Sequence, residues 1–260
     1  MTRILLALLL SLGCVQAQQV RRALPVESSP EERARFLAAI PLPPDSRLAA
    51  RQASPVYLSH IAPLNRMWER FNRANFQKQL QWSQAVMAPR IPPPPVLYYM
   101  FSGPDFINAI SLFPNCQTYI MCGLESVGQI APPEALTDDQ LAPSLGNLRK
   151  ALGTILEFSF FITKDMKADL EQTEFKGVLP ILYTFLALSG CQIRDVQFLT
   201  LTPSGSLAAG GGGVPLVQIQ FSRGASRPIQ TLYYVRVNLA DDGGNAGLFA
   251  WMQGKPAGAG

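Results

Sequence analysis

The stretch YYMFSGPDFINAISLFPNCQTYIMCGLE, residues 98–125, decides how the chain folds. Two apolar runs of β type, residues 96–101 and 118–124, enclose an SGPD turn at residues 102–105 and an FPN break at residues 113–115. Apolar runs without alternation are typical of strands that are covered on both faces. We therefore predict interior strands here, with the few polar side chains between them holding tight bends.

Helical patterns precede this stretch. Ser29 and Glu32 form a capping box around Pro30, a residue that suits the first helical position, so a short helix is predicted there. Apolar residues recur at helical spacing over residues 64–87, with Phe76 on the adjacent side. A helix so rich in aromatic residues is expected to lie against a sheet.

Further helices are predicted after the stretch. Thr137 and Gln140 form a second capping box, and the apolar spacing that follows predicts a helix over residues 141–161. A short polar helix is expected at residues 163–170 and an apolar one at residues 179–189. Helices therefore fill the middle of the chain.

The last third of the chain has β patterns. Residues 196–202 predict a strand, and residues 217–221 and 233–239 alternate between apolar and polar side chains. The short connection at residues 223–228 predicts that the last two form an antiparallel pair. The whole pattern predicts an α+β fold: a mixed or antiparallel sheet, helices mainly on one face and a long N-terminal helix.

The first 17 residues have the pattern of an export signal. Arg3 is followed by an apolar run at residues 4–12 and by a small-residue cleavage site that ends at Ala17. The run is shorter than the roughly 20 residues of a spanning helix. We expect a protein exported to the periplasm or the extracellular space, and lipid anchoring at Cys14 is the alternative.

Basic residues concentrate before the decisive stretch. Residues 18–90 hold eleven Lys and Arg against five Asp and Glu, whereas residues 91–260 hold ten against thirteen. The excess indicates either a solvated face or a surface for anionic lipid headgroups, and no nucleic-acid partner is expected. A polyproline spacer at residues 92–95 coincides with the change of sign. The predicted organisation is a signal peptide (1–17), a basic helical arm (18–95), an α+β core (96–245) and a flexible Gly/Ala-rich tail (246–260).

Metal and cofactor chemistry finds little support. His60 is the single histidine, and a capping or surface position is expected for it. One histidine without a CxxC motif predicts no metal, and no cofactor is expected. After cleavage the chain keeps Cys116, Cys122 and Cys191, which are either buried thiols or include one disulfide made by Cys191.

Polar groups inside the decisive stretch are the candidate site. Asp105 and Glu125 would form a catalytic carboxylate pair at the ends of neighbouring strands, with pKa values separated by burial, as acid–base hydrolysis requires. In the alternative interpretation, Asp105 caps a turn through its own backbone. The candidate binding residues are Ser102, Asn108, Asn115 and Tyr99.

Four segments resemble a family of exported bacterial proteins that has no assigned activity. They are FSGPDF (101–106), FPNCQTYIMCGLESVG (113–128), TILEFSFFITKDM (154–166) and QTLYYVRVNLAD (230–241). The resemblance covers roughly residues 60–245 and implies an exported protein. Because the family has no assigned activity, the resemblance implies no functional residues.

The sequence leaves three functions open and does not decide whether the protein is an enzyme. The first is an exported binding or scaffolding protein with a protein or small-molecule partner. The second is a hydrolase that uses Asp105 and Glu125. The third is a lipid-anchored envelope protein whose basic arm lies on an anionic membrane surface.

Overall fold

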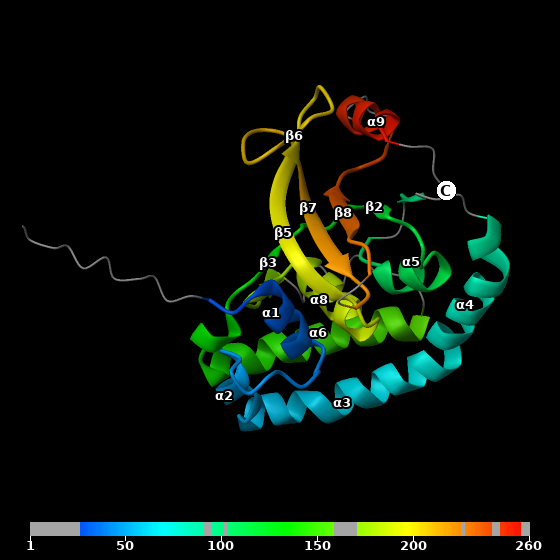
Figure 1. The fold of residues 1–260 in the computed structure, drawn as a ribbon. Helices are drawn as coiled ribbons and strands as arrows, with labels where there is room; N and C mark the ends of the chain where they lie inside the picture. The colour runs from blue at the N-terminus through cyan, green and yellow to red at the C-terminus, as the bar shows by residue number, and fades with distance from the viewer. Residues whose placement is uncertain are drawn as a thin grey trace, which may run out of the picture.

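The structure is a computed structural model that describes residues 27–90, 95–100, 103–158, 171–224, 227–240 and 245–255 (Figure 1). The predicted signal peptide with Cys14, the candidate residue Ser102 and the predicted helix at 163–170 lie outside these residues. The helices are α1 (Pro30–Leu37), α2 (Ala49–Gln52), α3 (Pro55–Phe71), η1 (Asn72–Phe76), α4 (Gln77–Trp82), η2 (Ser83–Met87), η3 (Ala88–Arg90), α5 (Phe106–Leu112), η4 (Pro133–Ala135), α6 (Asp138–Phe158), α8 (Leu179–Leu188) and α9 (Ala246–Gln253). The strands are β1 (Val96–Tyr99), β2 (Thr118–Gly123), β3 (Gln129–Ile130), β4 (Phe175–Lys176), β5 (Gln192–Leu201), β6 (Leu207–Ala208), β7 (Val214–Ser222) and β8 (Gln230–Arg236).

Six strands form one mixed sheet in the order β1-β2-β8-β7-β5-β6. β1, β2 and β8 are parallel, with Leu97 opposite Tyr119 and Tyr119 opposite Leu232. The pairs β8–β7, β7–β5 and β5–β6 are antiparallel. The predicted α+β fold with a mixed sheet is therefore confirmed, and so is the predicted antiparallel pair β7–β8.

The two faces of the sheet bury different clusters, because neighbouring residues of a strand point to opposite faces. Tyr119 and Tyr234 belong to the larger cluster, which contains side chains of α1, α3, α5, α6 and α8. Ile120 and Val235 belong to the smaller cluster, which α9 covers. The central strands are apolar on both faces for this reason.

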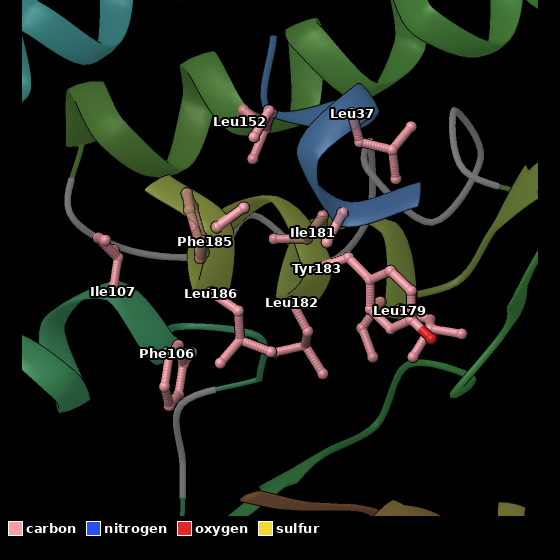
Figure 2. Packing of buried hydrophobic residues seen from close by; sticks show 14 of the residues in the cluster. Leu37, Phe106, Ile107, Leu152, Leu179, Ile181, Leu182, Tyr183, Phe185 and Leu186 are labelled. Carbon is pink, nitrogen blue, oxygen red and sulfur yellow. The ribbon is translucent and has the colours of Figure 1, made fainter. Parts of the chain in front are cut away.

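Helix α8 lies in the middle of the larger cluster. Every residue from Leu179 to Ala187 is buried, so this helix is apolar all round rather than amphipathic. In Figure 2, Leu152 of α6 and Leu37 of α1 lie on one side of α8, and α5 lies on another side. Gly190 ends the helix with a φ of 78°, a conformation that glycine adopts without a Cβ penalty.

The middle of the decisive stretch is a helix, which the β-type interpretation did not predict. α5 lies between β1 and β2, and its residues 106–111 are all buried. Phe106 makes edge-to-face contacts with Tyr119 and Phe221. Six consecutive buried positions erase the helical periodicity that sequence patterns depend on, so the sequence pattern contains no helix signal for residues 106–112.

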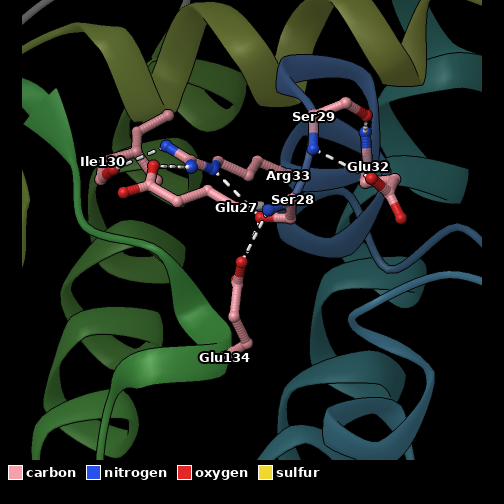
Figure 3. A network of polar contacts seen from close by, with 7 residues as sticks. All are labelled: Glu27, Ser28, Ser29, Glu32, Arg33, Ile130 and Glu134. Carbon is pink, nitrogen blue, oxygen red and sulfur yellow. Dashed lines mark hydrogen bonds and ion pairs between the residues drawn. The ribbon is translucent and has the colours of Figure 1, made fainter. Parts of the chain in front are cut away.

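The predicted N-terminal arm and core share one hydrophobic core. Phe36 and Phe76 from the arm belong to the same cluster as Tyr119 and Tyr234. Figure 3 shows how polar contacts also tie the start of α1 to the segment before α6. Ser28 donates its N–H and its hydroxyl to the two carboxylate oxygens of Glu134, at 2.6 and 2.9 Å.

The same network includes the predicted capping box of α1 (Figure 3). Arg33 donates to the Ser28 hydroxyl and to the Ile130 carbonyl, and it forms an ion pair with Glu27. Ser29 and Glu32 cap each other's backbone as predicted. The polyproline spacer thus does not divide the described chain into separate cores.

Residues 64–87 are helical, but they are not one regular α-helix. The helix begins earlier, at Pro55 behind a Ser54 cap, and it contains the π turns η1 and η2. A π turn holds an extra residue, so it rotates everything beyond it about the helix axis by about 100°. Phe76, expected on the adjacent side, is the last residue of η1 and already follows the extra residue, so it turns to the buried side and is 3% exposed.

Two smaller expectations have different outcomes in the structure. Residues 246–253, expected in a flexible tail, form α9, because Leu248 and Trp251 bury their side chains against the sheet. Cys116, Cys122 and Cys191 are free and buried, which matches the buried-thiol alternative. Within the described residues, none of the helices combines the length and apolar character that crossing a bilayer requires.

Candidate functional site

Asp105 lies at the carboxyl end of β1, at the start of α5. Its Oδ2 accepts a hydrogen bond from the Tyr99 hydroxyl at 3.1 Å, and its Oδ1 accepts one from Asn108 Nδ2 at 2.9 Å. Burial raises the pKa of Asp105 to about 6, although both hydrogen bonds act in the opposite direction. The carboxyl group is therefore held by this chain's own side chains.

The side-chain carbonyl oxygen of Asn108 lacks a partner among the described residues. Asn108 is 7% exposed, and its Oδ1 accepts no hydrogen bond from that part of the chain. An unpaired buried acceptor costs about 1–3 kcal/mol. Asn108 thus contributes to the position of Asp105 at some cost in stability.

Glu125 lies two residues beyond β2 and is also buried. The hydroxyl of Tyr234 contacts both its carbonyl oxygen, at 3.1 Å, and its Oε2, at 3.3 Å. Burial, followed by the nearby Glu125 carboxylate, raises the pKa of Tyr234 well above its ordinary value, so the hydroxyl stays protonated and donates. The two predicted catalytic carboxyls each have a tyrosine partner.

A pocket of about 690 Å³ lies at the opposite, amino-terminal end of the same three parallel strands. This volume falls within the range of small-molecule sites. Segments far apart in sequence form it: the residues before β1 and β2, the β7–β8 connection and the end of α8. The lining residues are Gln84, Pro95, Pro114, Asn115, Cys116, Gln117, Ser189, Gly190, Arg223, Arg227, Pro228 and Gln230.

Hydrogen bonds fix the wall of this pocket. Gln230 Nε2 donates to the Cys116 carbonyl at 2.7 Å and to the Pro114 carbonyl at 3.2 Å. The Gln117 N–H donates to the Pro95 carbonyl at 2.9 Å, and the Gln117 carbonyl accepts from the Thr231 N–H at 2.8 Å. A wall held in this way needs little ordering when a ligand enters.

The charge in the pocket is positive. Arg223 is half-buried, Arg227 is exposed, and neither forms an ion pair or a side-chain hydrogen bond with the part of the chain that the structure describes. The described lining residues include no carboxylate and no histidine. Burial raises the pKa of Cys116 to about 12, so this residue is a neutral thiol rather than a nucleophilic thiolate near pH 7.

The candidate residues from the sequence are thus divided between two places. Asn115 lines the pocket, whereas Tyr99, Asp105, Asn108 and Glu125 lie at the other end of the strands and are not among its lining residues. The remaining candidate, Ser102, lies outside the described residues.

The sequence interpretation missed both arginines of the pocket. Arg223 and Arg227 lie within the short connection between two paired strands, and that connection was interpreted only as a hairpin. Their position in front of β8, next to the polar residues in front of β2, is the signal that could have found them. It becomes visible only when β2 and β8 are known to be parallel neighbours.

His60 is buried inside α3, not at a cap or on the surface as expected. Its Nε2 donates to the Leu37 carbonyl at 2.9 Å, and its Nδ1 accepts from Arg149 at 3.1 Å. Burial lowers the pKa of His60 to about 4, so the ring is neutral near pH 7. With both ring nitrogens engaged, His60 joins α3 to α1 and α6.

Comparisons of the chain with protein-family models, curated proteins and solved structures gave no match. The resemblance carried by the FSGPDF and FPN segments therefore stays a prediction. In the described ranges, no three His, Cys, Asp or Glu side chains gather in a way that would hold a metal ion.

Proposed function

We propose that the protein is an exported binding protein whose pocket at the amino ends of β1, β2 and β8 holds a small anionic ligand. The observation that carries the proposal is the pair Arg223 and Arg227, which line one pocket without a carboxylate partner in the described chain. Arginine binds carboxylate and phosphate groups through parallel N–H donors. The pocket thus offers the charge that an anion needs.

The rest of the lining supports binding rather than catalysis. Asn115 and Gln117 are exposed amides that can donate to or accept from a polar ligand. Acid–base hydrolysis needs a titratable group near the reacting atoms, and the described lining offers only the neutral thiol of Cys116 and the two arginines. The pocket can recognise an anion, but its described lining offers no base to activate water.

A hydrolase that uses Asp105 and Glu125 is the second candidate. The raised pKa of Asp105 favours a general acid. Against this, Tyr99 donates a hydrogen bond to Asp105 and Tyr234 donates one to Glu125, and neither carboxyl group lines the pocket. Asp105 makes no side-chain capping hydrogen bond to α5, so the predicted turn cap is not what holds it; its contacts are with the side chains of Tyr99 and Asn108. Because both carboxyl groups are engaged inside the protein, the binding protein is the preferred function.

Thermal unfolding with inorganic phosphate, citrate and D-glucuronate tests the anion pocket, with sodium chloride at matched ionic strength as the reference. A ligand at 100 times its Kd stabilises the folded state by about 2.7 kcal/mol, so at least one anion is expected to raise the Tm. The variant R223A/R227A is expected to raise the Kd at least about tenfold, because two charge-assisted contacts are lost.

The matched control is R47A, which removes an exposed arginine outside the pocket. This variant is expected to keep the wild-type Tm shift. If none of the three anions stabilises the protein, or if R223A/R227A responds like the wild type, the pocket is not an anion site. Ligand turnover that disappears in D105N would favour the hydrolase instead.

A further inference from the structure

The outer side of the long helical run carries a second positively charged surface. α3, η1, α4 and η2 follow one another without a break and curve along the outer edge of the molecule (Figure 1). The inner side of the run buries Leu64, Phe71 and Phe76. The outer side exposes Arg66, Arg70, Arg73, Lys78 and Trp82, which together are called the basic helical face.

The π turn η1 assembles this face. At about 100° per residue, Arg66 and Arg70 of α3 share one side of the helical run with Arg73, the second residue of η1. In a regular α-helix Trp82 would lie about 160° from Arg66, on the buried side. The extra residue of η1 rotates α4 by about 100°, which brings Lys78 and Trp82 towards the arginines. The observed 50% exposure of Trp82 agrees with this rotation.

The charges on the basic helical face are not neutralised within the described chain. The described residues form two ion pairs, Arg33–Glu27 and Arg51–Asp138, and neither involves the basic helical face. One exposed carboxylate, Glu69, lies on the same helix. Four cations therefore point to solvent along about 18 Å of helix.

We propose that the basic helical face docks the protein on an anionic lipid surface. The surface is the outside of a helix rather than a hollow, which suits a flat layer of headgroups. Lys and Arg side chains near such a layer are attracted electrostatically. Trp82 has the apolar ring and polar N–H of residues that lie at the level of the headgroups. The docking does not depend on the anion pocket.

Sedimentation with phosphatidylcholine vesicles that contain one-fifth phosphatidylserine tests the docking. Binding is expected at 50 mM salt and is expected to weaken at 300 mM, because salt screens surface charges. Each charge contributes about fivefold to the partition coefficient, so R66Q/R70Q/R73Q/K78Q is expected to lower it more than 100-fold. W82A is expected to lower it less.

The matched control removes four exposed cations elsewhere: R47Q/K150Q/K176Q/R236Q. It has the same net charge as the first variant, but because it keeps the basic helical face intact it is expected to bind much more tightly than that variant. Each protein carries the same residues 1–26, so the apolar run at residues 4–12 contributes equally to all. R223A/R227A is expected to bind the vesicles like the wild type, which separates this docking from the pocket.

Three results would overturn the docking. The first is equal binding by the two quadruple variants, and the second is wild-type binding that salt leaves unchanged. The third is no vesicle binding together with capture by polyglutamate, which would assign the basic helical face to an acidic protein.

Discussion

The two ends of the parallel strands β1, β2 and β8 differ in whether their ionisable side chains have partners in the described chain. At the carboxyl end, Asp105 and Glu125 are covered by the chain and accept hydrogen bonds from Tyr99 and Tyr234. At the amino end, the arginines of the pocket have no carboxylate partner in the described residues. The same sheet thus carries hydrogen-bonded carboxyl groups at one end and, within the described residues, arginines without an ion-pair partner at the other.

This difference separates groups that serve the fold from groups that are available to a ligand. A buried carboxyl with a hydrogen-bond partner contributes to stability, and removing its partner leaves a desolvated group unpaired. A charge that lines a pocket without a partner contributes little to stability. Substitutions at the carboxyl end should therefore change unfolding, and those at the amino end should change binding.

The largest expected effect is at Gly123, in the carboxyl end of β2. A Cβ there would lie 2.5 Å from the Tyr234 hydroxyl, 2.8 Å from Glu125 Oε2 and 3.0 Å from the Gly103 Cα. G123A must therefore displace the Tyr234–Glu125 contact or the neighbouring backbone. We expect a loss of about 3 kcal/mol in the free energy of unfolding, measured by urea denaturation.

The matched control for this prediction is G146A in α6, where a Cβ would meet nothing within 4 Å. Alanine is favoured over glycine inside a helix by about 0.5–1 kcal/mol, so G146A should be more stable than the wild type. A neutral G123A would mean that the carboxyl end is loosely packed, and the contrast between the ends would lose its basis.

The next effect is a pH dependence that comes from Asp105. Because burial raises its pKa from the ordinary 3.8 to about 6, the folded protein binds this proton more tightly than the unfolded chain. The contribution of Asp105 to stability is fully present below about pH 3.8 and is lost as the pH rises through 6. Relative to D105N, the wild type should lose about 2 kcal/mol between pH 4 and 7, allowing for partial exposure.

Unfolding at several pH values measures this difference, with D45N at an exposed carboxyl as the control. His60 changes stability in the opposite sense, because its lowered pKa makes stability fall as the pH drops from 6.5 towards 4. That contribution is common to the wild type and D105N, so it cancels. A constant difference between the two proteins would show that Asp105 is solvated rather than buried.

The smallest expected effect is at Arg223, on the amino end. R223A should change the free energy of unfolding by less than about 0.5 kcal/mol, because the side chain is half-buried and has no ion-pair partner in the described residues. Urea denaturation without added anions measures it. A loss of 2 kcal/mol or more would place Arg223 among the groups that serve the fold.

Local signals in the sequence predicted much of the secondary structure. Ser29 with Glu32 and Thr137 with Gln140 cap the helices that they were expected to cap, because a capping box involves only residues three positions apart. β1, β2, β7 and β8 follow from apolar runs and alternation. Local patterns did not predict two features: α5, which is buried on all sides, and η1, which breaks the regular helical spacing.

The candidate site could be predicted only in part. Asp105, Asn108 and Tyr99 lie within ten residues of one another, so the sequence could group them, and the structure places them in contact. The pocket brings Asn115 together with Arg223, more than a hundred residues away. Nothing in the local pattern of either residue indicates the other.

The sequence by itself determined the fold class, the capped helices, the central strands and the excess of basic residues before residue 90, since these depend on composition and on neighbours within a few positions. Only the tertiary structure decided which charges are covered and which stay open. Burial, pKa and pairing depend on strand order and helix packing, which bring together residues that are distant along the chain.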